Sequence, residues 1–433
     1  MTEWLGFGTD LPWWGWALIL IGVIALVGVI GALFLPDWPS PDFTIGLDAE
    51  PGSDDFVAGV ATFLNDPVFQ GGEATLLQNG DGFYPVMLQA IRDAHDTINF
   101  ETYIFEPDEI GLQFLEAFKE RARDGVEVRF LIDGFGGLKL KKRYRDDLTR
   151  AGVKVQRFRP LGLRNLVRIY RREHRRATVI DGKIGFTGGA AISKKWKGNV
   201  TNKHEWRDSM TRITGPMVAG IQSAFAENWV YCTGEVLAGP RFFPSLERGP
   251  GISGISVVSS PSDSLQTIRL LFWLSFSNAR KRLWICNSYF IPDRRLRDAV
   301  IERARHGVDV RVLVPGNHTD AVPVQAAGQS YYEELLKAGI RIFEYEPSMM
   351  HAKTAVIDSA WSIVGSANMD ERSMELNEEN VLGIADRGFA RSVEEGLLAD
   401  YSRSREILLE QWQKRSIIRR GFERVAKALI EQY

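Results

Sequence analysis

The sequence has very little cysteine and no excess of charge of either sign. Of its 433 residues only Cys232 and Cys286 are cysteines, too few for a disulfide framework or a structural zinc site. Two unpaired buried thiols are expected, which fits a cytoplasmic compartment, with a single disulfide left open. The formal net charge is −2, so the overall balance favours no class of partner.

Basic residues are also absent from the beginning of the chain, where the first is Arg92. The run from Trp13 to Leu35 has 23 residues and no charge. As a helix it would reach about 34 Å, enough to cross a bilayer core. Tryptophans at its edges are typical of interface anchors, and no basic n-region or cleavage site marks a signal peptide. We therefore expect a tail at 1–12, a transmembrane helix at 13–35 and a linker at 36–72.

The orientation of this predicted helix rests on weak signals. With no Lys or Arg near either end, the positive-inside rule has almost nothing to count. The acidic tail, with Glu3 and Asp10, lacks the charges that would hold it inside. We expect a single-pass protein of the cell membrane with its catalytic body in the cytoplasm.

An internal duplication is the most informative feature of the chain. TINFETYIFEPDEIGLQFLEAFKERARDGVEVRFLIDG, from Thr97, matches RLWICNSYFIPDRRLRDAVIERARHGVDVRVLVPG, from Arg282. Each reads as strand, helix and strand, with Gly125 and Gly307 as left-handed helix ends. This alternation predicts parallel sheets covered by helices, an α/β fold. We expect two duplicated domains forming a pseudo-dimer, at 73–238 and 255–400, with a linker at 239–254 and a C-terminal amphipathic segment at 401–433.

One motif stands at matching points of both halves. It has a histidine, a cation two residues later, a carboxylate seven residues after the histidine, and then a glycine pair or a glycine and serine. The members are His174, Arg176, Asp181 and Gly188-Gly189 in the first half, and His351, Lys353, Asp358 and Gly365-Ser366 in the second. Residues two apart on a strand point to one face, so each histidine should project beside its cation. The glycines would let backbone approach a phosphate closely.

These repeats resemble the phospholipase D superfamily, and more narrowly the bacterial cardiolipin synthases, from about Glu73 to Trp412. The stretches that carry the resemblance include FETYIF, IGFTGG, WRDSMTRITGP, NSYFIPD, RVLVPG, HAKTAVID, GSANMDERS and LNEEN. The resemblance implies two phospholipase D-type domains that transfer a phosphatidyl group from phosphatidylglycerol through a phosphohistidine. It implies no metal ion and no other cofactor.

The resemblance also implies roles for particular residues. His351, Lys353 and Asn368 would bind the phosphate, and Asp358, with Asp181 at the matching point, would support the site. Glu379 would orient His351, and Asp208 would orient His174. The first half departs from the family pattern, because Arg176 replaces the lysine and Ala191 replaces the asparagine. Arginine keeps the charge, whereas alanine cannot donate a hydrogen bond.

The implied reaction uses the two histidines in different roles. One attacks phosphorus while the other protonates the leaving alkoxide and later deprotonates the incoming hydroxyl. We expect His174 to be the nucleophile and His351 the acid and base, and the reverse assignment stays open. Two further functions also stay open: a phospholipase D-type hydrolase of phospholipids, and a degenerate homologue that binds lipid with little turnover.

Two basic segments of the sequence indicate which molecules the protein could bind. Between Lys139 and Arg176 there are fifteen Lys or Arg against three Asp or Glu, which is either a solvated face or a surface for anionic lipid headgroups. A nucleic-acid partner is not expected beside a membrane span. Near the C-terminus Ile418, Phe422, Val425 and Leu429 share a helical face, which would pack on the second domain or lie in the membrane interface. The sequence does not predict an oligomeric state.

Overall fold

The computed structural model describes residues 12–34, 46–160, 162, 171–261 and 266–430, and the chain divides into two units. One unit holds helix α1 (Trp13–Phe34). Wherever side chains are described, no helix is both long enough and apolar enough to cross a membrane. The transmembrane helix at 13–35 therefore stays a prediction. The predicted tail before residue 12 and residues 35–45 of the predicted anchor and linker lie outside the described residues.

The described residues of the other unit form two mixed β-sheets. The first sheet has seven strands in the order β2 (Ala74–Gln78), β8 (Ser209–Thr214), β7 (Ile184–Gly188), β6 (Ala177–Ile180), β3 (Thr97–Thr102), β4 (Glu127–Asp133) and β5 (Lys154–Phe158). The second has nine, in the order β1 (Phe69–Gln70), β9 (Ser253–Ser259), β15 (Glu379–Ala385), β14 (Trp361–Gly365), β13 (Thr354–Ile357), β10 (Arg282–Cys286), β11 (Asp309–Pro315), β12 (Arg341–Tyr345) and β16 (Ser404–Ile407).

The two sheets repeat one pairing pattern, which confirms an α/β fold and corrects the expectation of parallel sheets. Strands β3, β4 and β5 are parallel, and so are β10, β11 and β12. The motif strands β6 and β13 instead pair antiparallel with both neighbours. The reason is local: only three residues join β6 to β7, and so short a connection can only make a hairpin.

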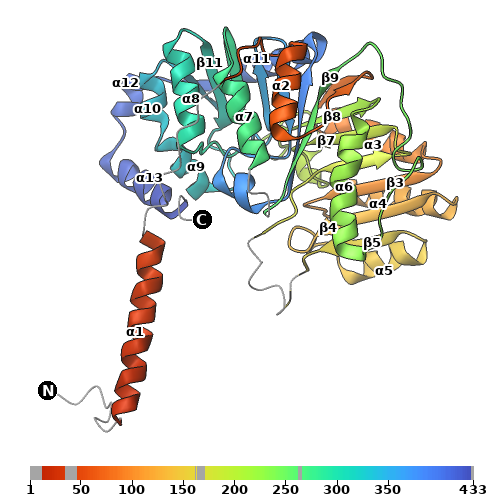
Figure 1. Cartoon of the computed structure of the whole chain (residues 1–433), viewed down its shortest axis with the longest axis horizontal. Helices are drawn as coiled ribbons and strands as arrows, with labels where there is room; N and C mark the ends of the chain where they lie inside the picture. The colour runs from red at the N-terminus through yellow and green to blue at the C-terminus, as the bar shows by residue number, and fades with distance from the viewer. Residues whose placement is uncertain (1–11, 35–45, 161, 163–170, 262–265, 431–433) are drawn as a thin grey trace. The chain divides into compact units, whose positions relative to one another are not determined.

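Helices cover both faces of each sheet (Figure 1). The first sheet carries α3 (Asn79–Arg92), α4 (Glu109–Arg123), α5 (Lys142–Arg150) and α6 (Val218–Thr233). The second carries α2 (Asp54–Leu64), α7 (Thr267–Ser277), α8 (Arg294–Arg305), α10 (Tyr332–Lys337) and α11 (Arg387–Ser402). Helix α9 (Val322–Gln329) instead packs against α13 (Ile417–Ile430), and α12 (Leu409–Gln413) packs against α10.

A shared core joins the two halves. One cluster of buried apolar side chains takes Val179 from the first sheet and Val356 from the second, with Phe225 of α6 and Leu397 of α11 between them. A second cluster lies under α3 and α4, where Phe83, Phe114 and Phe118 pack on the other face of the first sheet. Because one core is continuous across the halves, their relative position is set by close packing.

Local signals account for the repeated strand–helix–strand units. Asp108 caps α4 by accepting hydrogen bonds from two backbone N–H groups, and Asp293 caps α8 in the same way with one, as short acids do at helix starts. Gly125 and Gly307 then adopt positive φ values of 91° and 86°, as the sequence predicts. Both cysteines are free thiols.

The ends of the body differ from the sequence prediction. The segment predicted as a linker at 36–72 contains α2 and β1, which contact the second sheet. Helix α2 forms because Ser53 caps it and Phe56, Val57 and Val60 bury an apolar face. The segment predicted as amphipathic at 401–433 contains the end of α11, the edge strand β16 and two helices.

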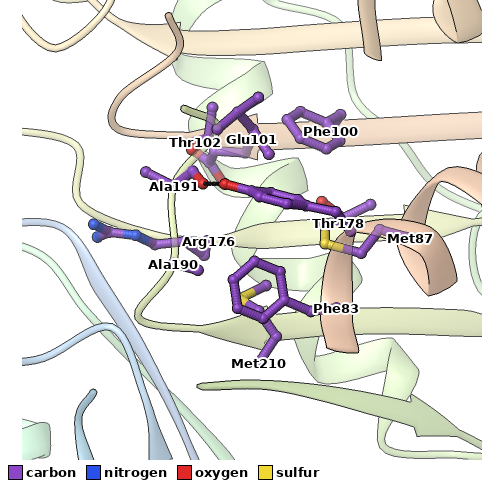
Figure 2. A pocket seen from close by; sticks show the side chains of 12 residues that line it. Phe83, Met87, Phe100, Glu101, Thr102, Arg176, Thr178, Ala190, Ala191 and Met210 are labelled. Atoms are coloured by element: carbon purple, nitrogen blue, oxygen red, sulfur yellow. Dashed lines mark hydrogen bonds between the residues drawn. The ribbon is translucent and has the colours of Figure 1, made fainter. Parts of the chain in front are cut away.

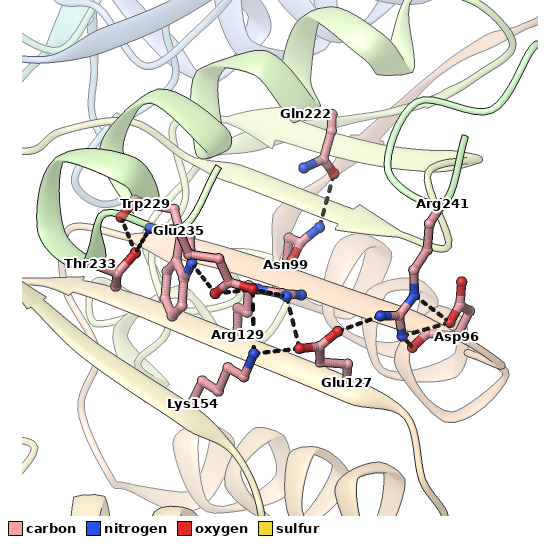
Figure 3. A network of polar contacts seen from close by, with 10 residues as sticks. All are labelled: Asp96, Asn99, Glu127, Arg129, Lys154, Gln222, Trp229, Thr233, Glu235 and Arg241. Carbon is pink, nitrogen blue, oxygen red and sulfur yellow. Dashed lines mark hydrogen bonds and ion pairs between the residues drawn. The ribbon is translucent and has the colours of Figure 1, made fainter. Parts of the chain in front are cut away.

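A network of ion pairs ties the end of α6 to the first sheet (Figure 3). The buried Arg129 of β4 contacts Glu127 at 2.8 Å and Glu235, just past α6, at 2.7 Å. Trp229 of α6 donates from Nε1 to Glu235 at 2.9 Å. The hydrogen bond from Arg129 lowers the pKa of Glu235 to about 2, so this carboxylate stays charged and holds α6 against β4.

Candidate active site

A cavity of about 830 Å³ lies between the two halves and receives side chains from both. It contains both motif histidines, together with Arg176 and Asn368. Its wall combines apolar and aromatic groups with several charged ones, among them Tyr103, Trp206, Tyr289, Ile291, Val324, Arg172, Lys195, Arg297, Asp320 and Arg372. A cavity of this size that combines an apolar and aromatic wall with convergent polar groups is typical of a small-molecule site.

Backbone pairing across the halves places the histidines. The N–H of His174 donates to Glu378 O at 2.9 Å, and the N–H of Glu378 donates to Arg172 O at 2.8 Å. The second half repeats this arrangement: the N–H of His351 donates to Arg207 O at 2.7 Å, and the N–H of Arg207 donates to Met349 O at 2.9 Å. Each histidine is therefore fixed to the segment that leads into Glu379 or Asp208 of the other half.

The ring of His174 is bound by a buried glutamate. Its Nδ1 lies 2.9 Å and 3.0 Å from the two carboxylate oxygens of Glu379, and Tyr103 packs edge-on with 5.1 Å between ring centroids. Burial, reinforced by the charge of Arg176, holds the pKa of His174 well below its usual value. Burial also raises the pKa of Glu379 to about 7, although Ser366 donates a hydrogen bond to it. A neutral imidazole with a free Nε2 is the form that can act as a nucleophile.

The ring of His351 is bound by a buried aspartate. Its Nδ1 lies 2.7 Å from Asp208 Oδ2, which also accepts from Trp196 Nε1 at 2.8 Å. Burial alone would raise the pKa of Asp208, but the charge and hydrogen bond of His351 lower it below its ordinary value. The pKa of His351 is lowered by burial and by Lys353, and Asp208 opposes that shift. A charged carboxylate at Nδ1 stabilises an imidazolium, so this histidine is suited to carry a proton.

The pairing of histidines and carboxylates corrects the sequence-based expectation. Glu379 was expected to orient His351 and Asp208 to orient His174, each within its own half. In the structure the partners are exchanged, and every histidine–carboxylate bond crosses between the halves. The physical reason is the backbone pairing described above, which brings β15 beside His174 and β8 beside His351.

The two motif cations are buried beside their histidines. Lys353 Nζ donates to Ser288 Oγ at 2.9 Å and to His351 O at 2.6 Å, and burial lowers its pKa to about 8. Arg176 donates to His174 O, while its Nε has no hydrogen-bond partner among the described residues. Each cation thus contacts the carbonyl of its own histidine, as expected from residues two apart on a strand.

The position of Ala191 distinguishes the first half from the second. In the second half Asn368 reaches the main cavity with an Oδ1 that has no partner among the described side chains. In the first half Ala191 is fully buried beside a separate cavity of about 10 Å³ lined by Phe83, Phe100 and Met210. Figure 2 shows the guanidinium of Arg176 extending away from these side chains. The first half therefore has a methyl group, which cannot form a hydrogen bond, where the other half has an amide.

The structure does not bring Asp181 and Asp358 to the cavity. Asp181 accepts hydrogen bonds from the N–H groups of three successive residues, 95–97, at the start of β3. Asp358 accepts from residues 280–282 at the start of β10. Both have a φ of 52°. They fasten the motif hairpins to the neighbouring strands and hold the histidines only indirectly.

The motif glycines also have a different role from the one expected. They do not line the cavity. A Cβ on Gly189 would lie 2.3 Å from Asp208 Oδ1, and a Cβ on Gly365 would lie 2.5 Å from Asn380 O. Glycine is therefore needed so that the strands bearing the carboxylates can approach, and not so that a phosphate can.

Sequence reasoning missed several residues around the rings. Trp196 and Trp206 both lie with ring centroids 5.4 Å from that of His351, and Tyr103 and Ser288 contact the two histidine–cation pairs. Tyr103 and Ser288 occur in the duplicated stretches FETYIF and NSYF, so the repeat itself carried a signal. Trp206 begins the stretch WRDSMTRITGP, whereas Trp196 lies outside the quoted stretches.

The basic run between Lys139 and Arg176 does not form one exposed face. Arg159 and Arg175 are inside the protein, where both contact Glu378, at 3.0 Å and 3.3 Å. Other members bind nearby acids on the surface, as Lys154 does with Glu127. Residues 161 and 163–170 of the run lie outside the described part of the chain.

In the described segments of the chain, no three His, Cys, Asp or Glu side chains are grouped as metal ligands.

Comparisons with known proteins agree with this arrangement. The family model described as the cardiolipin synthase PLD-like domain matches twice, over 87–214 and 275–400. Cardiolipin synthase A of Pseudomonas fluorescens is 35% identical over 364 residues, covering 84% of this chain and 75% of that protein. Cardiolipin synthase 1 of Bacillus cereus is 34% identical over 370 residues, covering 82% and 72%.

A solved structure supports the fold independently. The phosphatidylserine synthase of Haemophilus influenzae superposes with a TM-score of 0.66 at 16% identity, covering 87% of this chain and 96% of that one. At this identity the likeness concerns the fold alone.

Proposed function

The chain belongs to the phospholipase D superfamily, in the family of the cardiolipin synthases, and from this premise we propose that it is a phosphatidyltransferase that makes cardiolipin from phosphatidylglycerol. The observation that carries the proposal is the crossed pair of histidines, each bound at Nδ1 by a buried carboxylate of the other half. With Nδ1 bound by a carboxylate, the ring nitrogen left for chemistry is Nε2, and that of His351 lies 3.2 Å from Lys353 Nζ. Two such imidazoles lining one cavity suit a two-step exchange at a single phosphorus.

In the first step His174 Nε2 attacks the phosphorus of one phosphatidylglycerol. A bond forms between nitrogen and phosphorus while the bond to the glycerol headgroup oxygen breaks, and His351 gives its proton to that oxygen. Burial lowers the pKa of both histidines, but at His351 the carboxylate of Asp208 opposes this shift, whereas the partner of His174 is a glutamate of raised pKa; this difference supports the assignment. The products of this step are glycerol and a phosphatidyl–histidine.

In the second step the headgroup hydroxyl of another phosphatidylglycerol attacks the phosphatidyl–histidine. His351, now neutral, takes the hydroxyl proton, and His174 leaves as the neutral imidazole. In this scheme Lys353, Arg176 and Asn368 stabilise charge on the non-bridging oxygens. The sum is two phosphatidylglycerols giving one cardiolipin and one glycerol, with both histidines restored.

Product analysis of the purified full chain on phosphatidylglycerol vesicles tests this proposal. Cardiolipin and glycerol in equal amounts are expected. Phosphatidic acid in place of cardiolipin would show instead that water is the acceptor. The first half has Arg176 and Ala191 where the family pattern has lysine and asparagine. These departures are the reason for a further alternative, a homologue that binds lipid with little turnover. Complete absence of turnover by a folded protein would favour that alternative and overturn the transferase.

We further propose that residues 13–35 anchor the protein in the cell membrane by a single span, with its catalytic body in the cytoplasm beside an anionic lipid surface. The support is the uncharged run with flanking tryptophans. Extraction of membranes at alkaline pH should leave the full chain in the pellet, and protease added outside intact cells should spare residues 46–430. Release by alkali would contradict the span, and digestion from outside would reverse the orientation.

A further inference from the structure

Helix α13 packs on the body with its polar face. It contacts α9, and among its residues 417–428, whose side chains are described, Glu423 and Ala426 are the most deeply buried. Glu423 accepts from Arg415 at 3.0 Å, and Arg419 donates to Gln329 of α9 at 3.3 Å. The buried side of this helix therefore carries Glu423, bound by two arginines of the same C-terminal segment, the small side chain of Ala426 and a hydrogen bond to α9.

The apolar face of α13 is left outside. Ile418, Phe422 and Val425 share one face of the helix and are 85%, 50% and 59% exposed, and Ile417 beside them is also exposed. An amphipathic helix on a protein that is surrounded only by water buries its apolar stripe and exposes its polar one. This helix instead leaves its apolar stripe exposed, and contiguous exposed apolar residues of this kind mark an interaction surface.

The charges around this apolar face are positive. From Lys414 to Lys427 the sequence has six Lys or Arg and one acid, Glu423. That acid is buried and bound by Arg415 and Arg419, whereas Lys414 and Arg424 are exposed. A helix with an apolar face and flanking basic side chains matches the interface of an anionic bilayer, where apolar groups enter the acyl boundary and cations meet the headgroups.

Helix α9 connects this surface with the catalytic cavity. Ala321 and Val324 line the catalytic cavity, whereas Gln325 and Gln329 face the groove beneath α13. Val322, at the beginning of α9, is exposed and lines that groove beside Phe422. Figure 1 shows α13 beside α9. One short helix thus separates the exposed apolar face of α13 from the histidines.

We propose that Ile417, Ile418, Phe422 and Val425 of α13 insert into the surface of an anionic lipid bilayer, so that the edge of the catalytic cavity formed by α9 rests against the membrane. This inference rests on the proposed function for the identity of the substrate. The contact between α13 and the bilayer does not depend on that identity. It positions the cavity so that a lipid can move from the bilayer to the histidines without crossing water.

Photo-crosslinking tests the contact without reference to turnover. The full chain is reconstituted in bilayers that contain phosphatidylglycerol, with p-benzoylphenylalanine replacing Phe422 or, as a control, the similarly exposed Leu112 of α4. Irradiation should give a lipid adduct at position 422 and none at 112. A crosslink between two copies of the chain, or lipid adducts of equal yield at both positions, would overturn the proposal.

A rate ratio tests the consequence for catalysis. Ile418→Glu/Val425→Glu is compared with Leu112→Glu, using phosphatidylglycerol bilayers and a short-chain phosphatidylglycerol that is monomeric in water. The α13 variant should lower the ratio of bilayer rate to monomer rate by about tenfold or more, and Leu112→Glu should leave it unchanged. If this ratio were unchanged in the α13 variant, and its unfolding temperature matched that of the wild type, the proposed insertion of α13 into the bilayer would be refuted. If instead the wild type turned over neither substrate, the proposed function would fail while the crosslinking result still stood.

Discussion

The two halves of this protein share a backbone pattern and differ in the side chains that meet the cavity. Both arrange three parallel strands beside an antiparallel motif hairpin, and both fasten that hairpin with an aspartate, Asp181 or Asp358. In the second half Lys353 contacts Ser288 and Asn368 reaches the cavity. At the corresponding points the first half has an arginine, a tyrosine and a buried alanine.

The difference shows that the two halves are not two copies of one site. Because each histidine is bound by a carboxylate of the other half, neither half holds a complete histidine–carboxylate pair. His174 pairs with the glutamate whose pKa is raised to about 7, and His351 pairs with the aspartate whose pKa is lowered. The divergence of the halves therefore gives the two histidines different electrostatic environments. A reaction in which one imidazole attacks and the other moves a proton requires such a difference.

The largest effect is expected from removing either histidine. His174→Ala and His351→Ala should each lower turnover by about 10³-fold or more, since nucleophile and proton carrier act as one unit. The two variants should differ in one respect. With a lipid bearing a leaving group that needs no protonation, His351→Ala should accumulate phosphatidyl–protein detectable by mass spectrometry, and His174→Ala should not. An adduct on residue 351 in the His174→Ala protein would reverse the roles of the two halves.

The next largest effect is expected from neutralising Asp208 and Glu379, the carboxylates that each bind a histidine of the other half. Asp208→Asn should cost roughly 10³-fold and Glu379→Gln roughly 10²-fold in kcat/KM, because Asp208 is charged at neutral pH whereas Glu379 is only partly so. The crossing itself is tested by double-mutant cycles on thermal stability. Asp208→Asn should couple to His351→Ala by about 0.5–3 kcal/mol, and Glu379→Gln should couple to His351→Ala by nearly nothing. The opposite pattern would restore pairing within each half.

The duplication made much of this structure predictable from the sequence. Matching stretches from Thr97 and Arg282 specify strands, helices and their glycine ends through local patterns of burial and capping. The repeat also predicts that both motifs meet at one interface. These inferences need only short-range information or the equivalence of the two copies.

Other features depended on contacts between segments distant in the sequence. The partner of His351 is decided by the pairing of Arg207 with residues 349–351, which no local pattern contains. Gly189 makes room for Asp208 and not for a phosphate, for the same reason. Likewise the periodicity of α13 identified its apolar face correctly but could not decide whether that face lies inside or outside. That depended on the packing of α13 against α9, which includes the hydrogen bond from Arg419 to Gln329.

The two motif cations should respond differently to alkaline pH. Burial lowers the pKa of Lys353 to about 8, so its positive charge is present below this pH and is lost as pH rises through it. An arginine at 176 stays protonated throughout. We expect kcat/KM to fall about tenfold between pH 7 and pH 9, and we expect Lys353→Arg to shift this fall to higher pH. A wild-type profile that stays flat up to pH 9.5 would show that the charge of Lys353 is not required.

A smaller effect is expected from making the first half more like the second. Arg176→Lys should change turnover by less than about threefold or raise it, because a lysine can also reach His174 O and carries the same charge. Lys353 shows that this arrangement can be built, since its ammonium contacts His351 O. The measurement is kcat/KM on phosphatidylglycerol vesicles. A loss of a hundredfold or more would show that this half is built around the bidentate geometry of arginine.

The smallest effect on catalysis is expected from replacing the two hairpin aspartates. The two replacements should also have the most similar effects in the two halves. Asp181 and Asp358 each accept three backbone N–H groups at 2.7–2.9 Å and lie away from the cavity. Replacing either by alanine removes the acceptor of several charge-assisted bonds, which should lower the free energy of unfolding by about 2–3 kcal/mol.

This loss should be nearly the same for Asp181→Ala and Asp358→Ala, because the surrounding backbone is the same in both halves. The midpoint of denaturant unfolding is the measurement, and kcat of the protein that remains folded should stay within about twofold of wild type. A large fall in kcat in either variant without a fall in stability would place that carboxylate in the chemistry. Unequal losses of stability would show that the two halves differ in their scaffolds as well as in their sites.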